Sequence, residues 1–357
     1  SKRRLSLLRD SVDFALTAGN LKEAEEAASA FRRVEVGQGA GKDPMSDKEG
    51  WKQAFSEDAE PIVTFEGDAG DFFNTVLTRD AFVAFQAPEK TGKTYWLIEI
   101  AMRALRQRRR VAFFEVGDLS EPQLRRRLGM RWSGRPMWRK QTLEPIMVPQ
   151  SIEMDESEDI GYAIESSAQR VREVLTYESV QRGIKRFRRA FGLGKDGSYI
   201  RTSVHPTGTL SVKGIDAVLD QWEQDHGFTA DVICIDYADI LAPERVLKDF
   251  RHQIDETWAA LRALSQKRHA LVITATQTNA DAYKMGVKLQ TKANFSENHR
   301  KIAHVTAMIG LNQTPEEKAI QGMRLNLLAV RESDYNQLCS RTSAVLCKIC
   351  DDPGQFS

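Results

Sequence analysis

The stretch that decides the fold runs from residue 81 to residue 105 and reads AFVAFQ-APEKTGKT-YWLIEIAMRAL. The apolar run 81–86 predicts a strand, and the spacing of apolar residues over 92–107 predicts a helix. The residues that connect them have the phosphate-loop pattern, with alanine in place of the usual first glycine; they are Ala87, Pro88, Glu89, Lys90, Thr91, Gly92, Lys93 and Thr94. An ordinary strand–turn–helix connection would leave Gly-Lys-Thr at the helix start unexplained, so we predict a nucleotide site here.

Each part of this loop has a physical task in nucleotide binding. Backbone amides of the loop and the helix N-terminus would face the β-phosphate. The Lys93 ammonium would reach the β- and γ-phosphates, and the Thr94 hydroxyl would ligate Mg²⁺. The expected cofactors are therefore ATP and Mg²⁺.

The rest of the chain alternates strands with helices. Further apolar runs predict strands at 110–116, 231–236, 270–276, 304–311 and 324–330, and the segment 250–266 has one apolar helical face. Nearly continuous apolar strands separated by helices indicate a mainly parallel sheet that helices cover on both faces. The predicted fold class is therefore α/β.

The segments outside this pattern suggest a domain organisation. Residues 1–35 predict a short helical N-terminal segment, and residues 36–59, rich in Gly, Asp, Ser and Lys, predict a linker. Residues 60–357 would form the ATPase domain, with a less regular basic and acidic region at about 126–225.

Composition excludes several classes of protein. Lys and Arg total 51 against 50 Asp and Glu, so any contact with nucleic acid must come from local basic patches. No apolar run approaches the length of a membrane span, and the opening SKRRLSLLRD lacks the apolar core of a signal peptide. With four cysteines in 357 residues, a disulfide framework is not expected, and we expect a cytoplasmic protein without a membrane partner.

A second candidate site residue is Asp236, at the end of the apolar run VICID. Ligands of open α/β sheets bind at the carboxyl ends of the strands. Asp236 would therefore hold Mg²⁺ through a water molecule, whereas alone it could equally be a turn-forming carboxylate. Asp239 is a lesser candidate for this role.

The strand after the loop helix ends in two carboxylates, in VAFFEVGDLSEPQLRRRL. Hydrolysis of a nucleoside triphosphate needs a carboxylate that orients and polarises the attacking water. Asp118, just past the strand end, is the first choice, and Glu115 within the strand is the second. Asp118 could instead cap a helix that starts near Ser120.

A polar residue also ends the central apolar strand in ALVITATQTNADAY. An amide at Gln277 could sense the γ-phosphate and pass its presence to the following loop. The alternative is a surface amide without such a role.

These four motifs, in this order, resemble the RecA-like ATPase core and, within it, the DnaB-type replicative helicases, most closely their phage- and plasmid-type relatives. The segments that match the family's ordered motifs are IDY at 235–237, SEPQLRRRL at 120–128 after the carboxylate strand, and TQTN at 276–279. The resemblance covers about residues 60–350. It implies a RecA-like P-loop NTPase core, a homo-oligomer in the form of a hexameric ring, and partner proteins of replication, a phage or a plasmid.

The resemblance also implies a residue that acts between subunits. Arg331, just past the predicted strand RLNLLAV, falls where the family has an arginine finger that reaches the neighbouring subunit's ATP. The family usually has a lysine two residues earlier, and this chain has Ala329 there.

Three basic segments are candidates for single-stranded DNA binding. Segments 125–140 and 182–195 interleave positive charges with aromatic residues, which suits single-stranded nucleic acid but also a solvated helix face with aromatics in the core. RecA-like rings direct the loop after the Gln277 strand toward the central pore. We therefore favour this loop, whose lysines recur every four residues at Lys284, Lys288 and Lys292.

Two functional hypotheses follow. The first is an ATP-driven hexameric DNA helicase that acts in replication and translocates on single-stranded DNA. The second is a RecA-like or KaiC-like regulatory or DNA-binding switch that uses ATP without unwinding. A recombination-type filament former is a third, weaker reading.

Overall fold

The structure is a computed structural model, and it describes residues 13, 17, 43, 45–49, 51–52, 61–117, 119–137, 146–154, 161–169, 173–194, 198–245, 250–278, 300–331, 344–350 and 355–356. The chain divides into two compact units, Ser1–Asp58 and Ala59–Ser357. The predicted N-terminal helices and the linker lie largely outside the described residues. Within the described part, no helix has the length and apolar character needed to cross a bilayer.

A nine-stranded sheet organises the second unit in the order β11-β10-β9-β8-β1-β7-β6-β2-β5. Neighbours from β8 to β5 pair in parallel, and β9, β10 and β11 extend the sheet with antiparallel pairs. The prediction of a mainly parallel α/β sheet is therefore confirmed. The bounds of the strands are β1 Phe82–Ala87, β2 Val111–Val116, β5 Ile200–His205, β6 Val232–Asp236, β7 Leu271–Gln277, β8 Ala307–Asn312, β9 Gly322–Val330, β10 Ala344–Cys350 and β11 Gln355–Phe356.

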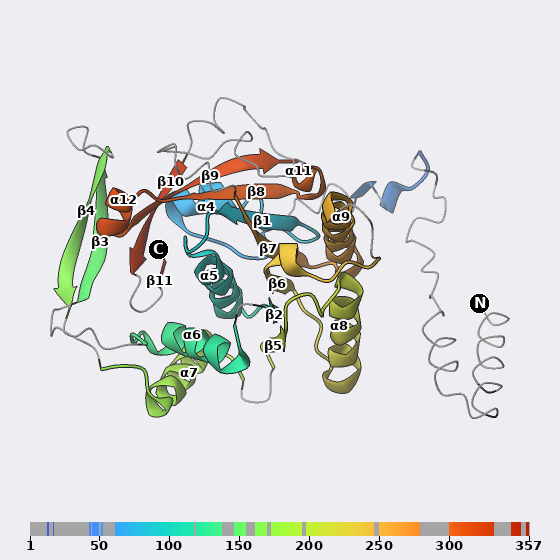
Figure 1. Ribbon diagram of the computed structural model, residues 1–357, viewed down its shortest axis with the longest axis horizontal. Coiled ribbons are helices and arrows are strands. Elements are labelled where there is room, and N and C mark those ends of the chain that lie inside the picture. The colour runs from blue at the N-terminus through green and yellow to red at the C-terminus, as the bar shows by residue number, and fades with distance from the viewer. Residues whose placement is uncertain are drawn as a thin grey trace. The chain divides into compact units, whose positions relative to one another are not determined.

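Helices cover both faces of the sheet, as Figure 1 shows. One face packs against α4 (Gly67–Phe73), α5 (Lys93–Arg106) and α6 (Glu121–Ser133), and α7 (Tyr177–Phe191) packs on α6. The other face packs against α8 (Val212–His226) and α9 (Phe250–Arg268), which lie side by side.

Strand alternation divides the apolar residues between two cores. In β1, Val83 and Phe85 face α5, whereas Phe82 and Ala84 face α9. Each core is centred on a tryptophan, Trp96 on the α5 side and Trp258 on the α9 side, and both are almost fully buried. Continuous apolar strands are thus explained by burial on both faces.

Between β2 and β6 the chain contains helices and strands in the region that the sequence analysis described as less regular. Besides α7, β5 and α8, they include a hairpin of β3 (Ile146–Met154) and β4 (Tyr162–Gln169). The Tyr162 hydroxyl donates a 2.8 Å hydrogen bond to Glu317 in α12 (Pro315–Ala319), and Arg324 of β9 forms an ion pair with the same carboxylate at 2.6 Å. These contacts attach the hairpin to the β9 side of the sheet.

Candidate functional site

The phosphate loop joins the end of β1 to the start of α5 in a tight turn. Lys90 and Gly92 have left-handed backbone dihedrals, with φ of 58° and 84°. Glycine tolerates this region without a steric cost, which explains its position directly before the helix. The helix begins at Lys93, so its N-terminus and the positive end of its dipole lie at the loop.

The Lys93 side chain folds back onto this loop. Its ammonium donates hydrogen bonds to the carbonyl oxygens of Ala87 at 3.1 Å and Pro88 at 2.8 Å. Thr94 is the second residue of α5, beside the loop. The amine and the hydroxyl that the sequence assigned to phosphate and Mg²⁺ therefore lie together at the helix start.

Four adjacent strands carry the candidate site residues to one edge of the sheet. The strands lie in the order β1-β7-β6-β2, and Ala87 is in register with Gln277, as Asp236 is with Glu115. In each of β7, β6 and β2, the residue two positions before the candidate belongs to the core on the α5 face; these residues are Ala275, Cys234 and Phe113. Strand alternation therefore directs Gln277, Asp236 and Glu115 to the same face, the one from which α5 rises.

Asp236 and Gln277 are held within this edge. Asp236 is buried, with 5% of its surface exposed, and the Gln277 side-chain amide donates a 3.3 Å hydrogen bond to the Tyr237 hydroxyl. Burial, and next the nearby Asp236 charge, raise the pKa of the Cys234 thiol. Cys234 is therefore a neutral core residue and not a nucleophile.

Of the two candidate carboxylates after the loop helix, Asp118 lies outside the described residues. Glu115 is buried, and its carboxylate accepts a 3.1 Å hydrogen bond from the Leu119 amide, which fixes the turn that follows β2. Ser120 is the N-cap residue of α6, with Gln123 reaching back to its amide at 2.8 Å. The helix start therefore has its own cap at Ser120, which weakens the alternative that Asp118 provides it.

Asp239 lies on the other face of the sheet. Its carboxylate accepts a hydrogen bond from the Thr276 hydroxyl at 2.7 Å and forms an ion pair with Lys301 at 2.7 Å. Since the same alternation directs Asp236 to the α5 face, Asp239 belongs to a separate polar cluster. The sequence analysis missed Lys301, because no local pattern marks a lysine whose partner lies 62 residues away.

Arg331 follows β9 and is exposed. Its amide donates to the Thr306 carbonyl at 2.8 Å, and its guanidinium donates to the Ala303 carbonyl. Because β9 runs antiparallel to β8, Arg331 emerges at the amino edge of the parallel strands, opposite the phosphate loop. The alternative to a role between subunits is a surface ion pair of Arg331 with Glu332 or Asp334, and both of these residues lie outside the described residues.

The preferred DNA-contact residues Lys284, Lys288 and Lys292 also lie outside the described residues. The chain enters this segment through Thr278, whose amide donates to the Ala87 carbonyl at 3.2 Å. The last described residue before these lysines is therefore attached to the base of the phosphate loop.

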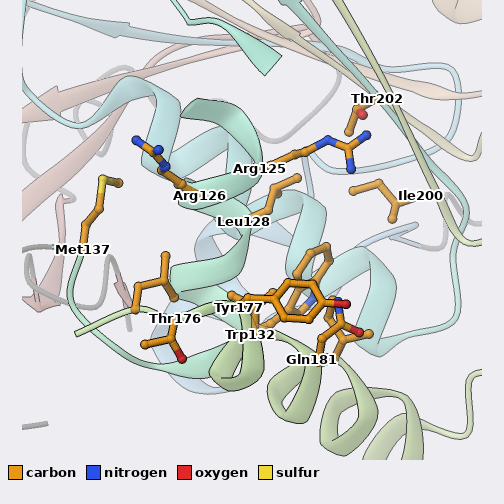
Figure 2. Close-up of a pocket in the computed structure, with 13 residues that line it drawn as sticks. Arg125, Arg126, Leu128, Trp132, Met137, Thr176, Tyr177, Gln181, Ile200 and Thr202 are labelled. Atoms are coloured by element: carbon orange, nitrogen blue, oxygen red, sulfur yellow. The ribbon is translucent and has the colours of Figure 1, made fainter. Parts of the chain in front are cut away.

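The other two basic segments contain most of α6 and α7, and an open cavity of about 690 Å³ lies between these helices and β5 (Figure 2). Arg125, Arg126 and the largely exposed Tyr177 lie at this cavity, and Leu128 and Trp132 line it. Trp132 and Phe187 also pack against the core of the sheet. Some aromatic residues of these segments are thus core residues, and the cavity lies beside β5, four strands from β1.

The strand order and the helices on both faces define the fold class, a RecA-like P-loop fold. Two solved structures have a similar fold. One is described as an ATPase domain; it matches at TM-score 0.63 and 13% identity, over 88% of this chain and 99% of that one. The other is a DnaB-like replicative helicase, described with its interactions with primase; it matches at TM-score 0.69 and 12% identity, over 99% of this chain and 75% of that one. No protein-family model matches the chain, and no curated protein matches it. The predicted resemblance to DnaB-type helicases is therefore confirmed for the fold.

Proposed function

We propose that this chain is an ATP-hydrolysing, DNA-binding motor, a hexameric DNA helicase of the DnaB-like kind that acts in replication. The observation that carries the proposal is the convergence of four neighbouring strands. β1, β7, β6 and β2 bring the phosphate loop, Gln277, Asp236 and Glu115 to one edge and one face of the sheet.

The residues at this edge fit MgATP. Lys93 already hydrogen-bonds to carbonyl oxygens within the loop, and phosphate oxygens could accept the same donors. Thr94 and Asp236 offer a hydroxyl and a carboxylate, the hard oxygen ligands that Mg²⁺ prefers. Bound there, Mg²⁺ would neutralise charge on the β- and γ-phosphates.

The chain's own residues would then divide the work of hydrolysis. Asp118 orients the attacking water, with Glu115 as the second candidate for this role. Gln277 senses the γ-phosphate, and its hydrogen bond to Tyr237 supports this role because it holds the amide at the edge. Arg331 acts on the ATP of a neighbouring subunit, and its position at the opposite edge supports action in trans.

Single-stranded DNA would bind through Lys284, Lys288 and Lys292. The contact between Thr278 and Ala87 supports this choice, since the segment that contains the lysines begins at the phosphate loop. The rival function, a RecA-like or KaiC-like switch, keeps support from Ala329, which replaces the family's lysine.

The deciding experiment measures ATP turnover with and without single-stranded DNA, together with native mass. We expect DNA-stimulated turnover in a hexamer, its loss in Lys93→Ala, and its retention in Lys267→Ala, which removes an exposed lysine at the end of α9. Unchanged turnover in Lys93→Ala would refute the nucleotide site. A forked DNA substrate then separates a helicase from a switch, because a switch would hydrolyse ATP without unwinding, and images of the assembly separate a ring from a filament.

A further inference from the structure

A buried polar cluster lies on the α9 face of the sheet. It adjoins the edge that carries the phosphate loop, Gln277, Asp236 and Glu115, which we call the nucleotide edge. The Lys301 ammonium contacts the Asp239 carboxylate at 2.7 Å and the Thr276 hydroxyl at 2.9 Å. The same carboxylate accepts the Thr276 hydroxyl at 2.7 Å and the Trp258 indole N–H at 3.3 Å. The Lys301 ammonium also lies 5.3 Å from the centre of the Trp258 ring.

The two charges are largely removed from water. The side chains of Lys301 and Asp239 are 10% and 16% exposed. A buried ion pair generally contributes little net stability, because desolvation offsets the attraction, and an apolar replacement of the pair is often neutral. Fold stability is therefore a weak reason for a pair at this position, and what the pair connects is more informative.

One side of the cluster belongs to the nucleotide edge. Asp239 follows Asp236 by three residues, in the short helix η1 (Ala238–Ile240). Thr276 directly precedes Gln277, whose backbone amide is 3.4 Å from the Asp239 carboxylate. A displacement of the Gln277 backbone, as its amide follows a phosphate, would therefore also move the backbone amide and the Thr276 hydroxyl that contact Asp239.

The other side belongs to the chain that returns from the lysine-containing segment. Lys301 is the first residue of α11 (Lys301–His304) and lies nine residues after Lys292 in the chain. The helix is fixed to α9, because the His304 ring contacts the Asp255 carboxylate at 2.7 Å and Arg300 lies 3.6 Å from it. Lys301 thus connects the end of the segment to the nucleotide edge, while Thr278 connects its start.

We infer that the Asp239–Lys301 ion pair is a positioning device, which couples the nucleotide state at Gln277 to the segment that binds single-stranded DNA. The inference rests on the proposed function and names the residues that regulate it. Asp239 and Lys301 touch neither nucleotide nor DNA in this scheme and act through Thr276 and Gln277.

The test removes both charges together. The double variant Asp239→Asn/Lys301→Met leaves no isolated buried charge, so its fold is retained better than in either single variant. The matched control is Asp216→Asn/Arg268→Met, which removes an ion pair of similar exposure, 22% and 13%, between α8 and the end of α9. That end of α9 precedes β7, at the edge of the sheet away from the nucleotide site.

The measurement is the affinity for fluorescent single-stranded DNA with a non-hydrolysable ATP analogue and with ADP. For the wild type we expect the two affinities to differ roughly 5-fold or more, the usual range of coupling between sites. In the double variant the difference is expected to fall toward onefold, with the affinity for the ATP analogue retained, and in the control it is expected to persist. Thr276→Val, which keeps the ion pair and removes its hydroxyl link to β7, is expected to reduce the difference and serves as a second variant.

Other outcomes would overturn the inference. A wild-type difference in the double variant, no difference in the wild type, or an equal loss in the control would each remove the coupling role. A wild-type chain that binds neither the ATP analogue nor single-stranded DNA would instead refute the proposed function, and this result appears before any variant is made.

Discussion

The role of Arg331 can be tested sharply, because the sheet separates it from the phosphate loop of its own chain. Val330 pairs with Ala307, and Ala307 pairs with Val83, four residues before Ala87. The separation is therefore at least about 13 Å along the strands and about 10 Å across two strand spacings. An arginine side chain cannot cover this distance, so Arg331 acts on a neighbouring subunit or on no nucleotide at all.

The perturbation is Arg331→Ala. A guanidinium that stabilises charge on the transferring phosphoryl group is worth roughly 10³-fold in turnover or more. The loss to the fold is small, about 1 kcal/mol, because the visible side-chain contact is one hydrogen bond to the Ala303 carbonyl. The matched control is Arg79→Ala, which removes an exposed arginine that likewise donates to a carbonyl, that of His269, at 2.6 Å. We expect this control to keep its ATP turnover.

The assay mixes Arg331→Ala with Lys93→Ala, each expected to be inactive alone. In mixed rings, a Lys93→Ala subunit lends its Arg331 to the intact loop of an Arg331→Ala neighbour. Random assembly at a 1:1 ratio restores about one interface in four of a head-to-tail ring. No recovery in oligomers shown to be mixed, or full turnover of Arg331→Ala alone, would refute action in trans and remove a main argument for a ring.

Three further predictions concern the catalytic carboxylate, DNA and stability. Asp118→Asn is expected to bind ATP but lose turnover by about 10²-fold or more, and a near-normal rate beside an inactive Glu115→Gln would assign the role to Glu115. When Lys284, Lys288 and Lys292 are neutralised together, the slope of log affinity for single-stranded DNA against log salt concentration is expected to become shallower by about 2, because each phosphate contact contributes about 0.7. In urea denaturation, Glu99→Gln is expected to lower the free energy of unfolding by about 3–5 kcal/mol, because the Arg131 side chain, 4% exposed, keeps its charge buried without its carboxylate partner. The double variant Glu99→Leu/Arg131→Met is expected to lose much less, and an equal loss would contradict this reasoning.

The strands around the nucleotide edge could be predicted because their information is local. A phosphate loop occupies eight consecutive residues between an apolar run and a helix, and Asp236 and Gln277 each end an apolar run. Parallel strands bring their carboxyl ends to one edge, so the fold class alone predicts that these residues meet. The sequence analysis therefore placed Lys93, Asp236 and Gln277 at one site without knowing the strand order.

The direction of individual strands and the sheet face on which a side chain lies were harder to predict. The sequence marks RLNLLAV as a strand, but its antiparallel pairing with β8 depends on the compact connection through α12, and this pairing decides the edge at which Arg331 emerges. Similarly, Asp236 and Asp239 look alike in the sequence, although one ends a strand and the other lies in the helical turn after it. The partners of Asp239 lie far away in the chain, so no local pattern distinguishes the proposed ligand of Mg²⁺ from the partner of Lys301.

The division of polar groups between the two faces bears on how a motor of this fold could work. Residues proposed to contact nucleotide lie on the α5 face, and the Asp239–Lys301 pair lies on the α9 face, with Thr276 and Gln277 as consecutive residues that face opposite ways. A displacement of the Gln277 backbone also displaces Thr276, because the two residues share one rigid peptide unit. In the proposed coupling, a backbone shift at Gln277 on loss of the γ-phosphate would reach Lys301 through Thr276, on the face opposite to the proposed nucleotide contacts. If Gln277 senses ATP as proposed, this arrangement would allow one strand end both to sense ATP and to position Lys301.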